Sequence, residues 1–339
     1  MAPDFFSDVI QYFQLGALLA EPLRVQGGLL HRMWRIETTQ GVYALKQLSS
    51  HVGLDQPGVQ ARYEGTEQVA AEFAAAGIPA LGAIGMGGRY LFAGAGQFFL
   101  VYPWVEGVML STETISAPHA LEIAAVLARV HALNLKQLSL DMPHPEVYTA
   151  DQVRQFIQQA QEQACPFAAD LLDHQEELIV MNQAYAEAVP VLQGHLLISH
   201  GDLDQKNVLW QGQHQPILLD WESAGWINPL YDLVNTSLYW SGMTTEQFDP
   251  ELFFKMIANY RQYGGVIHGA HWQAAFAGVY SWINWMMYSI RQACKPGSSE
   301  HKTLALQQVP QTLAAMLRLR KWMPELLAKT ACCSAYGLV

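Results

Sequence analysis

Short apolar runs separated by turn residues fill the first hundred positions of the chain. Three of them, within residues 22–49, read PLRVQGG, HRMWRIETTQG and VYALKQL. Their apolar residues recur with a period close to two, and TTQG supplies a turn, so this segment predicts three antiparallel strands. RYLFAG and QFFLVYPW, joined by a Gly-Ala-Gly turn, predict a second hairpin. Between the two groups, the alanine-rich ARYEGTEQVAAEFAAAG predicts a helix that ends at Gly77, with Pro79 just beyond.

From Pro118 onward the apolar residues follow helical spacing. LEIAAVLARVHAL, residues 150–164 and residues 168–189 each predict a helix, and the pattern resumes after residues 196–225. Strands in one part of the chain and helices in the other indicate an α+β fold, with a small antiparallel-sheet lobe and a large, mainly helical lobe. We expect these lobes to span residues 1–104 and 105–339.

Two apolar segments could be mistaken for a secretory signal peptide or a transmembrane helix. The N-terminal MAPDFFSDVIQYFQLG carries acidic residues where a signal peptide needs basic ones, so it predicts an N-terminal helix. Residues 262–290 contain no Asp, Glu, Lys or Arg and are long enough to cross a bilayer. Gly264-Gly265 interrupts this segment, and Gln273 and Asn284 would be costly in hydrocarbon. We therefore expect a buried helix of the helical lobe and no membrane span.

Composition and net charge indicate which classes of binding partner the protein can have. The chain has 339 residues, of which 51% are hydrophobic, enough for a large buried core. It has 30 acidic and 19 basic residues, and the resulting net charge of −11 argues against nucleic-acid binding while tolerating a cationic partner. The four cysteines show no metal-ligand spacing, so we expect reduced thiols in a cytoplasmic protein.

The densest polar cluster is HGDLDQKNVLW, residues 200–210, which follows an apolar run. It has the form His-x-Asp with four residues between Asp202 and Asn207, and the later strand ILLDWE delivers Asp220. Phosphoryl transfer requires a carboxylate near the incoming hydroxyl and oxygen ligands that hold Mg²⁺ against the triphosphate. The pattern predicts Asp202 as the catalytic carboxylate, and Asn207 and Asp220 as magnesium ligands.

The same chemistry requires a cation beside the phosphates of the nucleotide, oriented by a carboxylate. Lys46 lies in the third predicted strand, and the following helix offers Glu64 and Glu67. We predict that Glu67 pairs with Lys46, with Glu64 as the alternative. Gly27-Gly28, between the first two strands, gives a turn whose backbone amides can approach a phosphate closely.

Together these pieces resemble the aminoglycoside phosphotransferase and choline kinase family, which has the protein-kinase-like fold. The resemblance covers nearly the whole chain, through the Lys46 strand, the helix ending AAAGIP, FFLVYPWVEG, AVLARVH, HGDLDQKNVLW and ILLDWESAGWINPLYDL. It implies a two-lobed kinase-like enzyme that uses ATP (or GTP) and Mg²⁺ to phosphorylate a hydroxyl of a small molecule. It also implies that the adenine lies against residues 100–104, with Val101, Tyr102 and Trp104 as nucleotide contacts.

The resemblance separates supporting residues from reacting ones. His200 is expected to brace its loop, and Asp232, in a Pro-x-x-Asp-Leu turn, to be a structural carboxylate. Lys206 either contacts the γ-phosphate or is a solvated lysine. Asp204 is expected to face the acceptor, and Glu222 either to face the acceptor or to hold a second metal ion.

The sequence predicts the reaction but only suggests a class of phosphate acceptor. Trp282, Trp285 and Tyr288 suggest a surface that holds a cationic acceptor, similar to an aminoglycoside, choline or an amino alcohol, through cation–π attraction. The alternative is a buried helix face, because helical spacing alone gives the same pattern.

Two other functions are disfavoured. DWE replaces the DFG of protein kinases and no APE-like segment follows it, which disfavours a kinase that acts on proteins. A nucleotide-binding pseudokinase or scaffold is the alternative from another class. Such a protein would usually lack one of the four residues Lys46, Asp202, Asn207 and Asp220, and all four are present.

Overall fold

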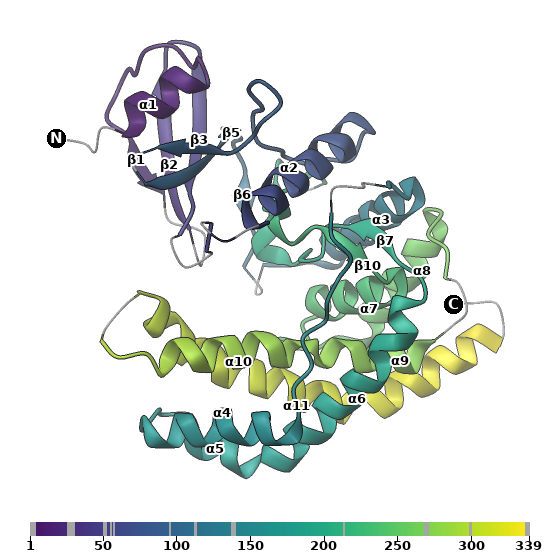
Figure 1. Ribbon diagram of the computed structural model, residues 1–339. Helices are drawn as coiled ribbons and strands as arrows, with labels where there is room; N and C mark the ends of the chain where they lie inside the picture. Colours follow the sequence, from purple (N-terminus) through teal and green to yellow (C-terminus); the bar gives the residue numbers. More distant parts are fainter. Residues whose placement is uncertain are drawn as a thin grey trace. The chain divides into compact units, whose positions relative to one another are not determined.

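The computed structural model describes residues 5–25, 31–49, 53–54, 56, 58–94, 96–111, 114–136, 140–212, 214–267, 271–297 and 300–335 (Figure 1). The chain divides into two compact units. Unit 1 comprises Met1–Met109, Lys136–Asp141 and His200–Gly225, and unit 2 comprises Leu110–Leu135, Met142–Ser199 and Trp226–Val339.

Unit 1 is built on a five-stranded antiparallel sheet in the order β1-β2-β3-β5-β4 (Figure 1). The sheet confirms the five predicted strands and both hairpins, as β1 (Leu23–Val25), β2 (Arg32–Thr38), β3 (Gly41–Gln47), β4 (Phe92–Gly94) and β5 (Gln97–Pro103). One face packs on α1 (Phe5–Tyr12) through a core that includes Leu45 and Phe99. A second core joins Leu100 and Tyr102 to Tyr63 of α2 (Val59–Ala75), the helix predicted between the strand groups.

A second, smaller sheet in unit 1 explains why residues 200–225 belong there. It consists of β6 (Val108–Met109), β8 (Val208–Trp210) and β9 (Pro216–Leu218) in the order β6-β8-β9. The N–H of Leu218 donates to the carbonyl of Pro79 (2.7 Å), and the N–H of Leu81 donates to the carbonyl of Leu218 (2.9 Å). The segment after α2 therefore lies along β9. The division into functional lobes after residue 104 remains a prediction.

Unit 2 is mainly helical, as predicted (Figure 1). Its helices are α3 (Ala117–Leu133), α4 (Ala150–Glu162), α5 (Ala168–Asp173), α6 (Gln175–Gln193), α7 (Pro229–Trp240), α8 (Pro250–Gln262), α9 (Trp272–Gly278), α10 (Trp282–Ala293) and α11 (Glu300–Ala335). Two short strands, β7 (Leu197–Ser199) and β10 (Gly225–Ile227), pair with each other.

The expectation of one buried helix over residues 262–290 was wrong. Helix α8 ends because Gly264 adopts a positive φ of 90° and the N–H of Gly265 donates to the carbonyl of Tyr260 (2.9 Å). This is the glycine-dependent termination typical of helix C-termini. Helix α9, a 3₁₀ turn at Val279–Ser281 and α10 follow in sequence. No described helix is both long enough and apolar enough to span a membrane. The predicted helix over residues 168–189 is likewise divided, into α5 and α6.

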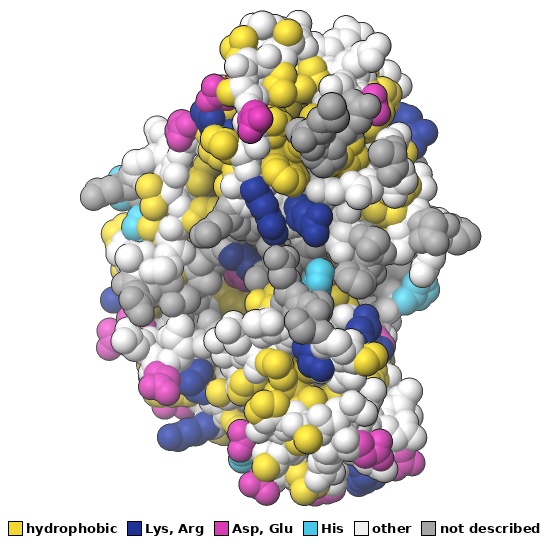
Figure 2. All heavy atoms as spheres, turned by 90° about the vertical axis from the view of Figure 1, so that its left-hand side faces the viewer, with side chains coloured by type: hydrophobic (Ala, Val, Ile, Leu, Met, Phe, Trp, Pro, Cys, Tyr) yellow, Lys and Arg dark blue, Asp and Glu magenta, His cyan; other side chains and the backbone are white. Residues whose placement is uncertain are grey.

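Charged side chains are mixed over the face of the molecule shown in Figure 2. Among the described residues of that face, lysine and arginine side chains form small separate groups between acidic, hydrophobic and uncharged ones. The distribution on this face agrees with the acidic net charge of −11.

Two buried thiols in unit 2 lead to a first prediction. Cys165 follows α4 and Cys294 follows α10, and their Sγ atoms lie 3.8 Å apart as free thiols. Because a disulfide requires only about 2 Å more of approach, we expect the oxidant diamide to convert the pair to a disulfide, losing two hydrogens. Peptide mapping by mass spectrometry should find the crosslink, and urea unfolding should show up to about 4 kcal/mol of stabilisation, because a long loop is closed in the unfolded chain.

The Cys165→Ser variant is the control for this oxidation. It should neither form the crosslink nor gain stability when treated with diamide. The prediction would be contradicted if diamide formed the Cys165–Cys294 disulfide readily in the unfolded chain but not in the native protein.

Candidate active site

Lys46 lies in a buried ion-pair cluster of unit 1. Its register partner in β5 is Leu100, so it shares that residue's face of the sheet. The Nζ atom donates to Asp220 Oδ1 (2.6 Å) and to Glu222 Oε2 (3.0 Å). Burial alone would lower the pKa of Lys46, but the charges of Asp220 and Glu222 outweigh it and raise the pKa above its usual value. The lysine is therefore a fixed positive charge, as phosphate binding requires.

Glu222 contacts three side chains of this cluster. Besides Lys46, its Oε2 accepts from His31 Nε2 (2.9 Å) and from the hydroxyl of Tyr63 (3.5 Å). Since His31 Nδ1 accepts from the N–H of Ser49 (3.1 Å), the ring proton lies on Nε2. Burial acts to raise the pKa of Glu222, but Lys46 and His31 outweigh it and lower the pKa.

The structure gives Lys46 different partners from the predicted glutamates. Glu67 accepts from the hydroxyl of Tyr102 (2.5 Å) and from the N–H of Ala83 (2.7 Å). Glu64 accepts from backbone N–H groups of the segment before β4. Within the described residues neither glutamate forms an ion pair with Lys46, because each is satisfied by groups nearer to α2.

The buried Glu67 leads to a pH-dependent prediction. Burial raises its pKa to about 7, against hydrogen bonds from Tyr102 and Ala83 that lower it. A carboxyl whose pKa is raised on folding stabilises the protein fully below its unfolded pKa of 4.5 and loses that contribution as pH rises through about 7. Between about pH 5 and pH 8, the free energy of unfolding of the native protein should fall. We expect this fall to be larger than that of the Glu67→Gln variant by on the order of 1–3 kcal/mol.

Urea unfolding at several pH values measures this difference. Glu162→Gln, which removes an exposed carboxylate at the end of α4, should follow the native profile. Parallel profiles for the native protein and Glu67→Gln would show that Glu67 does not titrate in this range.

Two side chains of its own loop, Asn207 and Lys206, hold Asp202. Asn207 Nδ2 donates to the Asp202 carbonyl (2.7 Å) and to its Oδ2 (2.9 Å), and Lys206 Nζ lies 3.1 Å from the same Oδ2. The side chain of Asp202 is still 32% exposed. Asp204, by contrast, is buried and turned toward its own loop, where it contacts Lys206 Nζ (2.9 Å) and accepts from the N–H of Lys206 (3.0 Å). Asp202 is thus the carboxylate that a substrate can reach.

His200 connects this loop to the DWE segment. Its Nδ1 accepts from the N–H of Asp202 (3.3 Å), so Nε2 carries the proton donated to the carbonyl of Leu219 (2.8 Å). The ring also packs on Trp221, with centroids 4.6 Å apart. In return, the N–H of Leu219 donates to the carbonyl of Asn207 (2.8 Å). This geometry fits the bracing role predicted for His200.

Asp220 is held in an unusual backbone conformation. Its φ is 58°, in the left-handed region that a non-glycine residue adopts only at a cost of order 1–3 kcal/mol. Trp221 secures the next turn, because its buried ring stacks on Phe73 of α2 (5.2 Å) and its Nε1–H donates to the carbonyl of Leu218 (3.2 Å). In this conformation Asp220 Oδ1 lies 2.6 Å from Lys46 Nζ.

Asn207 and Asp220 are suited to Mg²⁺. The Leu219–Asn207 backbone hydrogen bond places the two residues side by side, and both carry the hard oxygen donors that Mg²⁺ prefers. The described residues contain no group of three or more His, Cys, Asp or Glu arranged to hold a metal. Two protein ligands suffice when substrate phosphates and water complete the shell. Gly27 and Gly28, the predicted phosphate turn, lie outside the described residues.

The predicted adenine segment already uses part of its backbone within unit 1. The carbonyl of Val101 accepts from the N–H of Ile84 (2.7 Å), and the N–H of Trp104 donates to the carbonyl of Val42 (3.0 Å). Val101 and Tyr102 are buried. Contacts of this segment with a nucleotide remain a prediction and must involve other backbone groups than these two.

Asp232 lies in a buried network of unit 2. Its Oδ2 is 3.0 Å from His131 Nε2, and His131 Nδ1 is 2.8 Å from the hydroxyl of Tyr260. Asn228 accepts from two N–H groups at the start of α7 and so caps the helix that carries Asp232. This network joins α3, α7 and α8, as expected of a structural carboxylate.

The aromatic residues of α10 also belong to unit 2. Trp282 is buried, donates to Asn235 Oδ1 (3.0 Å) and packs on Tyr239 (5.1 Å). Trp285 and Tyr288 are half-buried and stack on each other, with centroids 5.3 Å apart. Trp282 therefore occupies the interior of the helix bundle.

His31 and Tyr63 are members of the cluster that sequence reasoning missed. His31 contacts a carboxylate 191 positions away in the chain, and Tyr63 one 159 positions away. A local signal for His31 is its place three residues after Gly28 of the predicted turn and immediately before β2.

The sequence model described as the phosphotransferase enzyme family matches residues 22–266. No curated protein sequence matches the chain. Among solved structures, spectinomycin phosphotransferase APH(9)-Ia, in complex with ADP and spectinomycin, is similar with a TM-score of 0.67 at 11% identity, over 93% of this chain and 98% of that one.

Two eukaryotic kinases are also similar. An ethanolamine kinase from Plasmodium vivax has a TM-score of 0.57 at 14% identity, over 91% of this chain and 85% of that one. A choline kinase from Cryptosporidium parvum has a TM-score of 0.52 at 15% identity, over 98% of both chains. At such identities the likeness shows the fold, which is the predicted protein-kinase-like one.

Proposed function

Because the chain belongs to the phosphotransferase enzyme family, it is a small-molecule phosphotransferase, and we propose that Lys46, Asp220 and Asp202 carry out its chemistry. The observation that supports this proposal best is the 2.6 Å contact between Lys46 Nζ and Asp220 Oδ1, which joins residues 174 positions apart. A fixed cation for phosphates and a carboxylate for a metal are thereby brought together beside the Asp202 loop.

Asp202 orients the acceptor hydroxyl and accepts its proton in the proposed mechanism. Its carboxylate is open to solvent, and hydrogen bonds from Asn207 and Lys206 restrict its orientation. Such positioning is the main contribution a protein makes to phosphoryl transfer. In this proposal Lys206, whose Nζ lies 3.1 Å from Asp202 Oδ2, contacts the γ-phosphate, which is one of the two roles predicted for it.

Asn207 and Asp220 hold the magnesium ion in this proposal. When bound, Mg²⁺ neutralises charge that develops on the phosphates. Lys46 binds the α- and β-phosphates of ATP or GTP, and Glu222 takes the anchoring part that the sequence assigned to Glu67. Glu222 suits that part because its Oε2 lies 3.0 Å from Lys46 and is fixed by His31. We place the protein in the cytoplasm, where ATP and reduced thiols are available.

The test is ATP-dependent phosphorylation of a panel of amines, amino alcohols, aminoglycosides and sugars, followed by mass spectrometry of the products. We expect at least one phosphorylated product, formed only with Mg²⁺, and a parallel run with GTP gives the nucleotide preference. Magnesium-dependent nucleotide binding with neither transfer nor slow hydrolysis would instead indicate a pseudokinase or scaffold and would overturn the proposal.

A further inference from the structure

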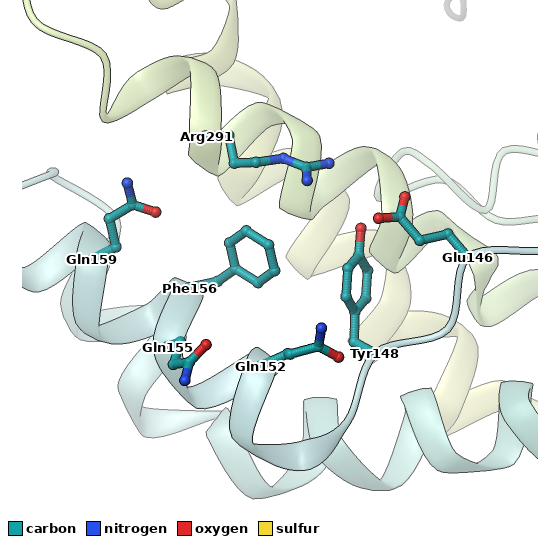
Figure 3. Close-up of a pocket in the computed structure, with 7 residues that line it drawn as sticks. All are labelled: Glu146, Tyr148, Gln152, Gln155, Phe156, Gln159 and Arg291. Atoms are coloured by element: carbon teal, nitrogen blue, oxygen red, sulfur yellow. The ribbon is translucent and has the colours of Figure 1, made fainter.

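A polar pocket lies within unit 2, between the segment before α4, α4 itself and α10 (Figure 3). Its volume is about 250 Å³. Positions 152, 155, 156 and 159 of α4 share one helix face, so their side chains form a continuous wall. The rest of the lining comes from Glu146, Tyr148 and, on α10, Arg291. The residues of the proposed phosphotransfer site belong to unit 1, and none of them lines this pocket.

The wall before α4 is held rigidly. Asn182 of α6 donates through Nδ2 to the carbonyl of Tyr148 (2.5 Å), and Asn284 of α10 donates to the carbonyl of Glu146 (3.0 Å). Thr149 caps α4 by accepting from the N–H of Gln152 (3.2 Å). A site whose walls are fixed before binding loses less entropy when a ligand enters.

The hydroxyl of Tyr148 has no hydrogen-bond partner of regular geometry among the described residues, although the side chain is only 6% exposed. Figure 3 shows it directed at the space between the carboxylate of Glu146 and the guanidinium of Arg291. Burial and the neighbouring Glu146 raise the pKa of Tyr148 to about 12, so the hydroxyl keeps its proton at neutral pH. Buried polar groups are nearly always paired, which indicates that a ligand group or water completes this site.

The lining determines which ligand fits. One carboxylate and one guanidinium nearly cancel in charge, so a strongly charged ligand gains little. The rings of Tyr148 and Phe156 meet edge to face (5.4 Å, 78°), and Arg291 lies over Phe156 at 5.5 Å. These rings offer an apolar surface to C–H groups. The side-chain amides of Gln152, Gln155 and Gln159 on α4 carry both hydrogen-bond donors and acceptors. The volume equals about eight water molecules, enough for one six-membered ring.

We propose that this pocket binds a neutral polyhydroxylated ring, a monosaccharide or cyclitol unit, through Glu146, Tyr148 and Arg291. The Tyr148 hydroxyl donates to a ring hydroxyl, Glu146 accepts from a neighbouring one, and Arg291 donates to a third. Adjacent hydroxyls match the paired atoms of carboxylate and guanidinium groups.

The test measures binding by isothermal titration calorimetry with glucose, galactose, mannose, N-acetylglucosamine and myo-inositol as probes, and with choline as the cationic comparison. The Asp202→Asn variant serves as the background, because binding is then observed without turnover. We expect saturable binding of at least one neutral probe, weakened about tenfold or more by Tyr148→Phe and by Arg291→Met, since each removes a hydrogen bond to the ligand. Arg129→Met, at another exposed arginine that lies on α3, should leave binding unchanged.

Thermal unfolding separates a ligand-binding tyrosine from a structural one. Tyr148→Phe removes an unpartnered buried hydroxyl, so we expect its melting temperature to equal or exceed that of the parent while its affinity falls. The proposal is overturned if no neutral probe binds, if choline binds more tightly than all of them, or if Tyr148→Phe binds the probes as the parent does.

Discussion

The Asp202→Asn variant should lose about 10²–10⁴-fold in kcat for phosphorylation of the acceptor found in the panel, because a positioned general base contributes that much. Asparagine keeps an oxygen that can accept from Asn207 Nδ2, now 2.9 Å from Asp202 Oδ2, so the loop should keep its shape. The substitution removes the carboxylate that, in the proposed mechanism, accepts the proton of the acceptor hydroxyl. Initial rates at saturating nucleotide measure the effect.

Nucleotide binding supplies the control for this variant. Asp202→Asn should bind ATP with Mg²⁺ as the native protein does, because the residues assigned to the nucleotide are Lys46, Asn207 and Asp220. Asp151→Asn, which removes an exposed carboxylate at the start of α4, should retain full activity. A kcat within a factor of about two of the native value would remove Asp202 from the mechanism.

The Asp220→Asn variant should lose both turnover and the magnesium dependence of nucleotide hydrolysis. The substitution removes the proposed anionic metal ligand, which is also one of the two carboxylates that contact Lys46. A metal ion contributes several kcal/mol of charge stabilisation to such a reaction, which corresponds to a loss of about 10²–10³-fold or more in rate. Titration of hydrolysis with Mg²⁺ measures it, and unchanged half-saturation by Mg²⁺ would contradict the assignment.

Glu222→Gln provides the comparison, because it lies two residues away and contacts the same lysine. It leaves Asp220 in place, so the dependence on Mg²⁺ should be kept. The variant loosens Lys46 and frees His31, and we expect a raised KM for the nucleotide and a smaller loss in kcat. Glu67→Gln, whose side chain contacts Tyr102 and Ala83 instead, should leave KM unchanged at pH 7.

The elements that local sequence determines were predicted well. The period-two runs around Lys46 became β2 and β3, and HGDLDQKN formed a loop in which neighbouring residues satisfy one another. Asn207, Lys206 and Asp204 interact within a few positions of Asp202. Such contacts depend on short stretches of backbone, so residue type and spacing carry enough information.

Contacts between distant segments were the part that sequence could not supply. Lys46 contacts Glu222 and Asp220 instead of Glu67. These two carboxylates lie near Lys46 because Trp221 stacks on Phe73 and so packs the DWE turn against α2. Glu67 is drawn instead to Tyr102, 35 residues later. The break between α8 and α9 depends on Gly264 adopting a positive φ; the sequence indicated an interruption at Gly264-Gly265 but not the division of the following residues into α9 and α10.

Lys46 also provides an internal counter-ion while no nucleotide is bound. Two carboxylates that share a half-buried position repel each other and commonly rely on a bound cation to remain ionised. Here the ammonium group lies 2.6 Å from one and 3.0 Å from the other, so the chain itself offsets one of the two negative charges and separates the carboxylates. Removal of divalent cations with EDTA should therefore leave the melting temperature unchanged. Differential scanning fluorimetry would check this, and the protein could then be purified and stored in chelator and recharged with magnesium for assay.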